Sequence, residues 1–273
     1  MCTVVVSLAP GARMPLLLLG VRDEFTDRTW RPPARHWPGS PLVGGRDEQA
    51  GGTWLAVHPD VPRVSCVLNG HGRAAAAGGR RTRGELPLRA AAEGQRALDA
   101  MHEHPGALAR YDPFHLVVAD ASAASLLSWD GSHAVLRELE HATHLLTNAG
   151  HAYPPAVPGP PAVPGPPAVP GPLAAGPQPP GDDAKARHFG PKFAARRPSG
   201  DPAATAEEAW EDWLALAAGD GLPAADPRAI IARRDMPGGR TWGTTSVTFV
   251  ALGRGALRYD FRPVPGEIYR VTV

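Results

Sequence analysis

The chain has 273 residues, of which 43% are hydrophobic, enough to form a buried core and to exclude disorder throughout. Its 28 lysine and arginine residues nearly balance 27 aspartate and glutamate residues, so the formal net charge is only +1. This balance provides no long-range field that would attract nucleic acid or an anionic membrane, and neither partner is expected.

The two cysteines, Cys2 and Cys66, are too few for a disulfide scaffold and lack the paired spacing of a zinc or redox site. We therefore expect a cytoplasmic protein with no metal and no cofactor. The apolar stretch MPLLLLGV, residues 14–21, is too short to cross a bilayer, and no positively charged region stands at the chain start. It is predicted to be a core strand, and Cys66 a buried strand thiol.

The first predicted elements form a β-hairpin. The runs TVVVSL and PLLLLGV are rich in strand formers, and the turn composition APGARMP lies between them. Further strands are predicted from short apolar runs. These runs are TWLAV (53–57), RVSCVLN (63–69), FHLVVAD (114–120), ASLLSW (124–129), THLLTN (143–148), TSVTFVAL (245–252) and EIYRVTV (267–273).

Two longer stretches predict helices. One spans residues 84–104, and the other spans residues 201–219, with Asp201 as the N-cap and Gly219 as the stop. In the second helix one face is apolar and includes two tryptophans, which favours a role as core anchors. The residues of that face are Ala206, Trp210, Trp213, Leu214 and Ala217.

A proline-rich segment interrupts this pattern at about residues 154–181. The motif PPAVPG occurs three times in residues 154–171, and 13 of the 32 prolines fall within residues 154–181. Regular helix or strand is excluded there, and the spacing of glycine excludes collagen. The segment is interpreted as an inert insertion, with an SH3-type ligand as the alternative, inside a single domain of residues 1–273.

The position of Cys2 suggests nucleophilic chemistry. Removal of Met1 would give Cys2 both a thiol and a free α-amine, whose reference pKa of about 7.7 to 8.0 suits a general base near neutral pH. If paired residue numbers in the hairpin sum to about 24, residues 22–24 lie opposite the chain start. Arg22 would then favour a thiolate at Cys2, and Asp23 could hold the α-amine.

Two limits apply to this site at the sequence level. Adjacent strand residues point to opposite faces, so Arg22 and Asp23 both reach Cys2 only if the strand has ended. Attack on a carbonyl also requires donors for the oxyanion. Asn69 and Asn148, each at the end of an apolar strand, are the candidates, although asparagine is also a common turn former.

The order of these motifs resembles the Asn-Arg-Asp-Glu (NRDE) family, the homologues of transport and Golgi organisation protein 2. More distantly, the chain is similar to choloylglycine hydrolases and penicillin V acylases, which are N-terminal-nucleophile (Ntn) hydrolases. The resemblance implies an α+β fold, a four-layer αββα sandwich of the Ntn-hydrolase type. The motifs are MCTVVVS (1–7), LLLLGVRDEFTDR (16–28), GGTWLAV (51–57), VSCVLNG (64–70), TRGELPLR (82–89), FHLVVAD (114–120) and HLLTNAGH (144–151).

The resemblance also implies roles for individual residues. Cys2 matches the nucleophile, Arg22 and Asp23 the charged pair beside it, and Asn69 and Asn148 the oxyanion donors.

The chain departs from the family pattern at three places. Val21 stands where the NRDE signature begins with asparagine, and Arg22 and Asp23 are adjacent, whereas the acylases separate this pair. In the sequence WGTTSV, Thr245 stands where the family commonly has arginine, with Arg240 nearby.

Two function classes follow from the resemblance. The preferred one is hydrolysis of a small acyl amide, at a non-peptide C–N bond, through a Cys2 acyl-enzyme. The alternative is a non-catalytic carrier of haem or an acyl or lipid ligand, since relatives are linked to Golgi organisation, lipid metabolism and haem handling. The histidines for haem are His71, His102, His104, His141, His144 and His151, without a convincing ligand set. The tryptophans and strand edges permit a homodimer.

Overall fold

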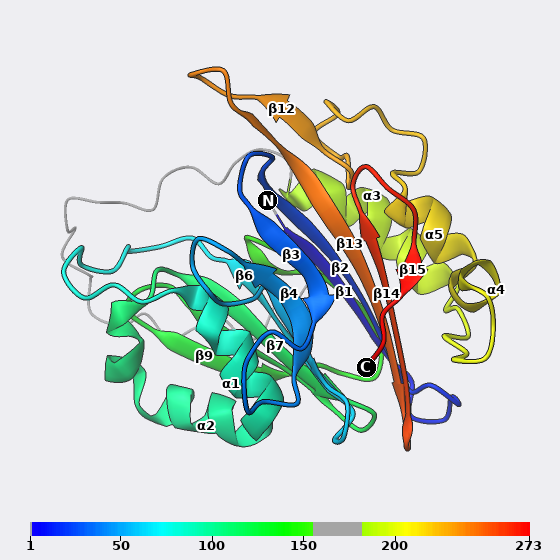
Figure 1. The fold of residues 1–273 in the computed structure, drawn as a ribbon, viewed down its shortest axis with the longest axis horizontal. Coiled ribbons are helices and arrows are strands. Elements are labelled where there is room, and N and C mark those ends of the chain that lie inside the picture. The colour runs from blue at the N-terminus through cyan, green and yellow to red at the C-terminus, as the bar shows by residue number, and fades with distance from the viewer. Residues whose placement is uncertain (1, 155–181) are drawn as a thin grey trace, which may run out of the picture.

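The computed structural model describes residues 2–154 and 182–273, and its architecture is mixed α/β with two antiparallel sheets and few helices (Figure 1). The predicted α+β class is confirmed at this level. Met1 and, apart from Pro154, the proline-rich segment lie outside the described residues.

The first sheet contains the first and the last strand of the described residues. Its strands follow the spatial order β11 (Gly150–Tyr153), β10 (Thr143–Thr147), β1 (Thr3–Leu8), β2 (Leu16–Phe25), β13 (Thr241–Gly253), β14 (Ala256–Pro263) and β15 (Tyr269–Arg270), and β12 (Arg233–Asp235) also pairs with β13.

The second sheet follows the chain order from strand to strand. Its strands are β3 (Trp30–Ala34), β4 (Val43–Asp47), β5 (Leu55–His58), β6 (Arg63–Asn69), β7 (Phe114–Asp120), β8 (Ala124–Trp129) and β9 (Ala134–Glu138).

The helices pack on both sheets. They are α1 (Leu86–Glu93) and α2 (Gln95–Glu103), with the short 3-10 helices η1 (Arg83–Glu85) and η2 (Pro105–Arg110), and then α3 (Asp182–Ala195), α4 (Ala206–Trp210) and α5 (Asp212–Ala217). In Figure 1, α1 and α2 lie beside the second sheet, whereas α3 and α5 lie beside the first. None of the helices in the described ranges has the length and apolarity needed to cross a bilayer.

The side chains of β1 and β2 alternate between the two faces of the first sheet, and this alternation explains how the sheet packs against the second sheet on one side and against helices on the other. Val4 and Leu18 face the second sheet and pack with Leu55 and Val117 in one core. Their neighbours in sequence point the other way, and this opposite face of the first sheet packs with Phe189 of α3 and both helical tryptophans. Strands covered on both faces are buried at every position, as β1 is, and they are rich in apolar residues. A third core joins α1 and α2 to the second sheet.

The predicted hairpin register is confirmed. Leu8 pairs with Leu16 and Thr3 with Val21, so the hairpin brings the residues that follow Val21 towards the chain start.

The prediction of one continuous helix over residues 84–104 is wrong, because the helix breaks at Gly94 into α1 and α2. Gly94 adopts φ +68°, and a Cβ atom there would lie 2.7 Å from the guanidinium carbon of Arg63. Arg63 Nη1 donates to the carbonyl oxygens of Ala91 and Ala92 at 3.0 and 3.2 Å, which terminates α1.

The predicted helix over residues 201–219 begins later than expected. Thr205 rather than Asp201 is the N-cap, and it forms a capping box with Glu208. The helix also breaks at Glu211, where φ is +42°. Trp210 and Trp213 are fully buried, so their predicted role as core anchors is confirmed.

The core between the sheets generates a stability prediction. Leu18 is fully buried there, so Leu18→Ala removes apolar contacts and leaves a cavity, and we expect a loss of about 2 to 5 kcal/mol in the free energy of unfolding measured with urea. Val61→Ala is the control, because Val61 is 49% exposed and its truncation should change stability by less than about 0.5 kcal/mol. Equal losses for the two variants would contradict this account of the core.

Candidate active site

A cavity of about 540 Å³ opens where β1 begins and where β2, β4 and β6 end. It contains four of the five residues singled out in the sequence, and the fifth, Asn148, contacts Cys2 directly. The wall is formed by Cys2, Arg22, Asp23, Glu24, Arg28, Asp47, Ala50, Thr53, Trp54, Val67, Asn69, Arg80, Arg81, Thr82, Arg83, Gly84 and Asp112.

Cys2 lies just before β1 and is half-buried at this cavity. Its thiol donates a long hydrogen bond to the carbonyl oxygen of Asp23, with a sulfur to oxygen distance of 3.8 Å. Its backbone nitrogen donates to Oδ1 of Asn148 at 2.9 Å. Cys2 is therefore anchored through its nitrogen, while its sulfur remains at the cavity.

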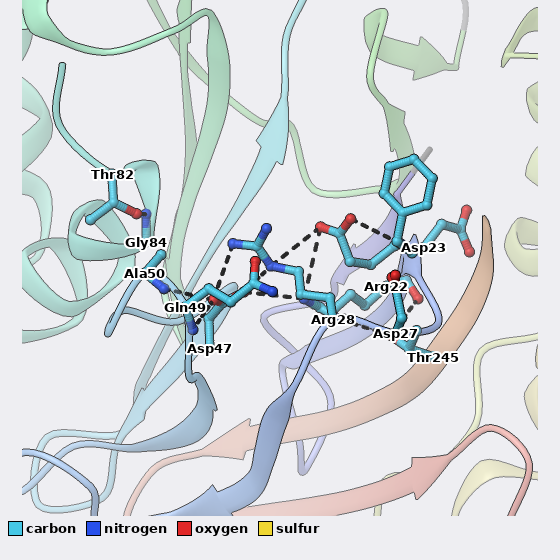
Figure 2. A network of polar contacts seen from close by, with 12 residues as sticks. Arg22, Asp23, Asp27, Arg28, Asp47, Gln49, Ala50, Thr82, Gly84 and Thr245 are labelled. Atoms are coloured by element: carbon cyan, nitrogen blue, oxygen red, sulfur yellow. Dashed lines mark hydrogen bonds and ion pairs between the residues drawn. The ribbon is translucent and has the colours of Figure 1, made fainter. Parts of the chain in front are cut away.

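Arg22 is buried on the face of β2 that looks towards the second sheet. Its Nη1 donates to Oγ1 of Thr245 at 2.9 Å, and its Nη2 donates to Asp47 at 3.4 Å (Figure 2). The guanidinium also lies over the ring of Trp54, 4.6 Å from its centroid. Burial lowers the pKa of Arg22, and the nearby Cys2 is the first of the groups that oppose this effect.

Asp23 points to the opposite side of β2, as strand alternation requires. Its Oδ1 accepts a hydrogen bond from Thr244 at 2.6 Å, and Nζ of the buried Lys185 lies 3.9 Å from its Oδ2. Burial raises the pKa of Asp23, and the ammonium of Lys185 acts against this shift. Arg22 and Asp23 thus approach the chain start from different faces of the sheet.

The two asparagines occupy different environments. Asn69, at the end of β6, is exposed and lines the cavity together with Cys2. Asn148 follows β10, and its Oδ1 faces the Cys2 nitrogen, so its amide nitrogen is the edge that remains as a hydrogen-bond donor.

Thr245 and Arg240, the two residues considered where the resemblance leads us to expect an arginine, lie in different places. Thr245 is buried and contacts Arg22, whereas Arg240 pairs with Asp27 on the surface, at 2.8 Å, and stacks on Phe25. Arg240 does not line the cavity, so it does not replace the missing arginine.

Asp47 is a residue that our sequence analysis missed. Arg28 donates to both of its carboxylate oxygens, at 2.6 and 3.1 Å, and the amides of Gln49 and Ala50 donate at 3.1 and 2.9 Å (Figure 2). Burial raises the pKa of Asp47, but the hydrogen bonds and charges from Arg28 outweigh it and leave the pKa below its usual value. The signal was the second Arg-Asp-Glu triplet, residues 46–48.

Arg83 was also missed, although it lies in the TRGELPLR motif. Its Nη1 donates to the carbonyl oxygen of Pro113 at 2.9 Å, and burial lowers its pKa. The segment that carries Arg83 is fixed by close backbone contact, because Thr53 donates to the carbonyl oxygen of Gly84 at 2.9 Å. A Cβ atom at Gly52 would lie 2.4 Å from the Gly84 backbone, so glycine is required there.

The histidines considered for haem do not gather at the cavity in the described parts of the chain. His144 and His151 instead contact each other, with 2.9 Å between Nδ1 of His144 and Nε2 of His151. Among the described residues, no group of three or more histidine, cysteine, aspartate or glutamate side chains is arranged to hold a metal ion.

The position of Asp47 generates a prediction about stability and pH. Because its pKa is lowered on folding, the ionised carboxylate stabilises the fold above its ordinary pKa of about 3.9, and this contribution is lost as the pH falls through the folded value. We expect Asp47→Asn to cost about 1 to 3 kcal/mol at pH 7 and to flatten the acid limb of the stability profile, measured by urea unfolding.

Asp27→Asn is the control for this prediction. Asp27 pairs with Arg240 in an exposed position, and its neutralisation should change the profile much less. Indistinguishable profiles for the Asp47 and Asp27 variants would contradict a structural role for the Asp47 network.

The comparison with known proteins identifies a family. No curated protein sequence shows a significant match. Residues 1–156 match the family described as Transport and Golgi organisation 2. The matched region includes the candidate residues from Cys2 to Asn148 and covers more than half of the chain. The resemblance of the sequence motifs is thereby confirmed, and the chain belongs to the Transport and Golgi organisation 2 family.

Proposed function

We propose that the protein is an N-terminal-cysteine hydrolase of small acyl amides. The observation that carries this proposal is the environment of Cys2. Its nitrogen is held by Asn148, and its sulfur lies at a cavity that also contains the buried Arg22. A nucleophile, a nitrogen that becomes a free amine on loss of Met1, and polar donors thus occur within one site.

The proposed fold type is the four-layer αββα sandwich of Ntn hydrolases, within one domain. Its support is the order of the three cores, one between the sheets and one under the helices on each outer side. Cys2 belongs to the edge of the central core, as the nucleophile of such a fold would.

The proposed reaction begins when the Cys2 α-amine takes the thiol proton and the sulfur attacks the acyl carbon. The tetrahedral intermediate then collapses, the C–N bond breaks, and the leaving amine takes the proton from the α-ammonium. Water attacks the resulting thioester, with the amine again as base, and releases the carboxylic acid and the free thiol. All atoms are supplied by the substrate, the enzyme and one water molecule.

The neighbouring side chains would divide the remaining tasks. The guanidinium of Arg22 would stabilise the negative charge that develops at the cavity during the reaction. The amide nitrogens of Asn69 and Asn148 would donate to the oxyanion, and Asp23 with Lys185 would provide a charged pair beside the chain start.

One arginine of the cavity wall favours a substrate with an anionic group. The wall contains five arginines and four carboxylate residues, and four of the arginines pair with carboxylates at distances between 2.6 and 3.5 Å, namely Arg22, Arg28, Arg80 and Arg81. Among the described residues no such ion pair is formed by Arg83, which contacts a carbonyl oxygen instead. Its guanidinium is therefore the group proposed to bind a carboxylate of the substrate.

Labelling of Cys2 tests the proposal. Intact mass should show that active protein lacks Met1 and that it carries an acyl group during turnover of acyl amides of a nitro-substituted aminobenzoate. We expect Cys2→Ala to lower turnover by about 10³-fold or more while binding persists, because only the nucleophile is lost. Cys66→Ala, which removes the other thiol, should remain active.

Three results would oppose the hydrolase. They are active protein that retains Met1, full activity of Cys2→Ala, and a wild-type protein that forms no acyl-enzyme with any of these amides, whatever the length of their acyl chain. Tight haem or acyl-ligand binding without turnover would instead favour the carrier.

Arg83 generates a separate prediction on specificity. We expect Arg83→Met to raise KM for the aminobenzoate amides by about tenfold, and to leave KM almost unchanged for matching amides in which the carboxylate is a carboxamide. Arg81→Met is the matched control, because Arg81 lines the same cavity but is already paired with Glu85. Similar effects of the two variants would contradict a specific anion contact at Arg83.

A further inference from the structure

The side chain of His115 connects the second sheet to the residue that holds Cys2. His115 lies on β7, and its Nε2 is 3.2 Å from the carbonyl oxygen of Asn148, which follows β10 of the first sheet. Its Nδ1 is 2.9 Å from Oγ of Ser128 on β8. Both ring nitrogens therefore have partners, one on a strand of the second sheet and one in the turn between β10 and β11 of the first sheet.

These partners determine how the ring is protonated. A carbonyl oxygen only accepts, so Nε2 carries the hydrogen and donates it to Asn148, while Nδ1 accepts from the Ser128 hydroxyl. Burial lowers the pKa of His115 to about 4, so the imidazole is neutral near pH 7 and does not act as a cation beside the site.

The turn that follows Asn148 is shaped around this ring. Gly150 has φ +99°, and a Cβ atom there would lie 3.2 Å from Cε1 of His115. The ring thus packs against the backbone of the turn, and its hydrogen bond fixes the main chain of the residue whose side chain faces the Cys2 nitrogen at 2.9 Å.

We infer that His115 is a positioning residue for the Cys2 nucleophile and acts through Asn148. This inference rests on the proposed hydrolase for its catalytic meaning. It goes beyond that proposal by adding a residue that lies outside the cavity wall and touches neither substrate nor Cys2. By holding the Asn148 main chain, His115 sets the direction of the amide that binds the Cys2 nitrogen and donates to the oxyanion.

The test compares His115→Leu with His115→Gln. Leucine removes both hydrogen bonds, whereas the glutamine amide supplies one donor and one acceptor. We expect His115→Leu to lower kcat by about 10- to 100-fold with KM changed by less than about twofold, and His115→Gln to recover most of the loss. The substrates are the aminobenzoate amides.

His144→Leu is the matched control. His144 is buried, whereas His115 is partly buried. His144 lies at the other end of β10, and its Nε2 is also near a backbone carbonyl oxygen, that of Glu140, at 2.9 Å. Its replacement should leave kcat and KM within about twofold of the wild type. An equal loss of kcat in both variants would show a general effect of destabilising β10 and would overturn the inference.

Alkylation of the thiols by iodoacetamide provides a readout that does not depend on turnover. Cys66 is buried and reports folding, because only unfolded protein should expose a second reactive thiol. In folded His115→Leu we expect Cys2 to react about tenfold more slowly, with recovery in His115→Gln, since the amine that serves as its base is misplaced.

The outcomes separate this inference from the proposed function. If the wild type turns over and His115→Leu matches it in kcat and in Cys2 alkylation, the role of His115 is wrong and the hydrolase stands. If no amide is turned over by the wild type, the hydrolase fails, and the alkylation rates alone decide whether His115 positions Cys2.

Discussion

The candidate site depends on the pairing of β1 with a neighbour on each side. Thr3 pairs with Val21 of β2 and with Thr147 of β10, so one step back along the chain brings Cys2 level with Arg22 and Asn148. Hydrogen bonding to two partners leaves a central strand little freedom to slip, because a shift of one residue would exchange the side chains that face the two cores. The register that builds the cores therefore also positions the thiol.

The same alternation that fixes the register separates the charges around Cys2. Arg22 lies on the face towards the second sheet with Asp47 and Thr245, and Asp23 lies on the face towards α3 with Lys185 and Thr244. Buried charges are costly unless they are paired and hydrogen-bonded, and each of these two has an oppositely charged neighbour. The sheet thus carries a cation and a carboxylate to one chain end without allowing them to neutralise each other directly.

The remaining wall of the site comes from the second sheet and its loops. Asp47 connects Arg22 to β4, His115 connects Asn148 to β7, and the contact between Gly52 and Gly84 fixes the short helix η1 that carries Arg83. These contacts cross between parts of the molecule that share no strand pairing. The geometry of the site therefore depends on how the two sheets pack, in addition to the register within the first sheet.

The sequence by itself determined the hairpin, its register, most strands and the family, because β-branched runs, turn residues and strand ends are local signals. It therefore placed Cys2 opposite Arg22 and suggested Asn148. Only the tertiary structure decided which residues meet them, since Lys185 and His115 arrive from distant elements whose positions depend on packing. The same reason explains the errors in the helices: the predicted 84–104 helix breaks at Gly94 because Arg63 of another element occupies the space beside it, a contact that no local pattern contains.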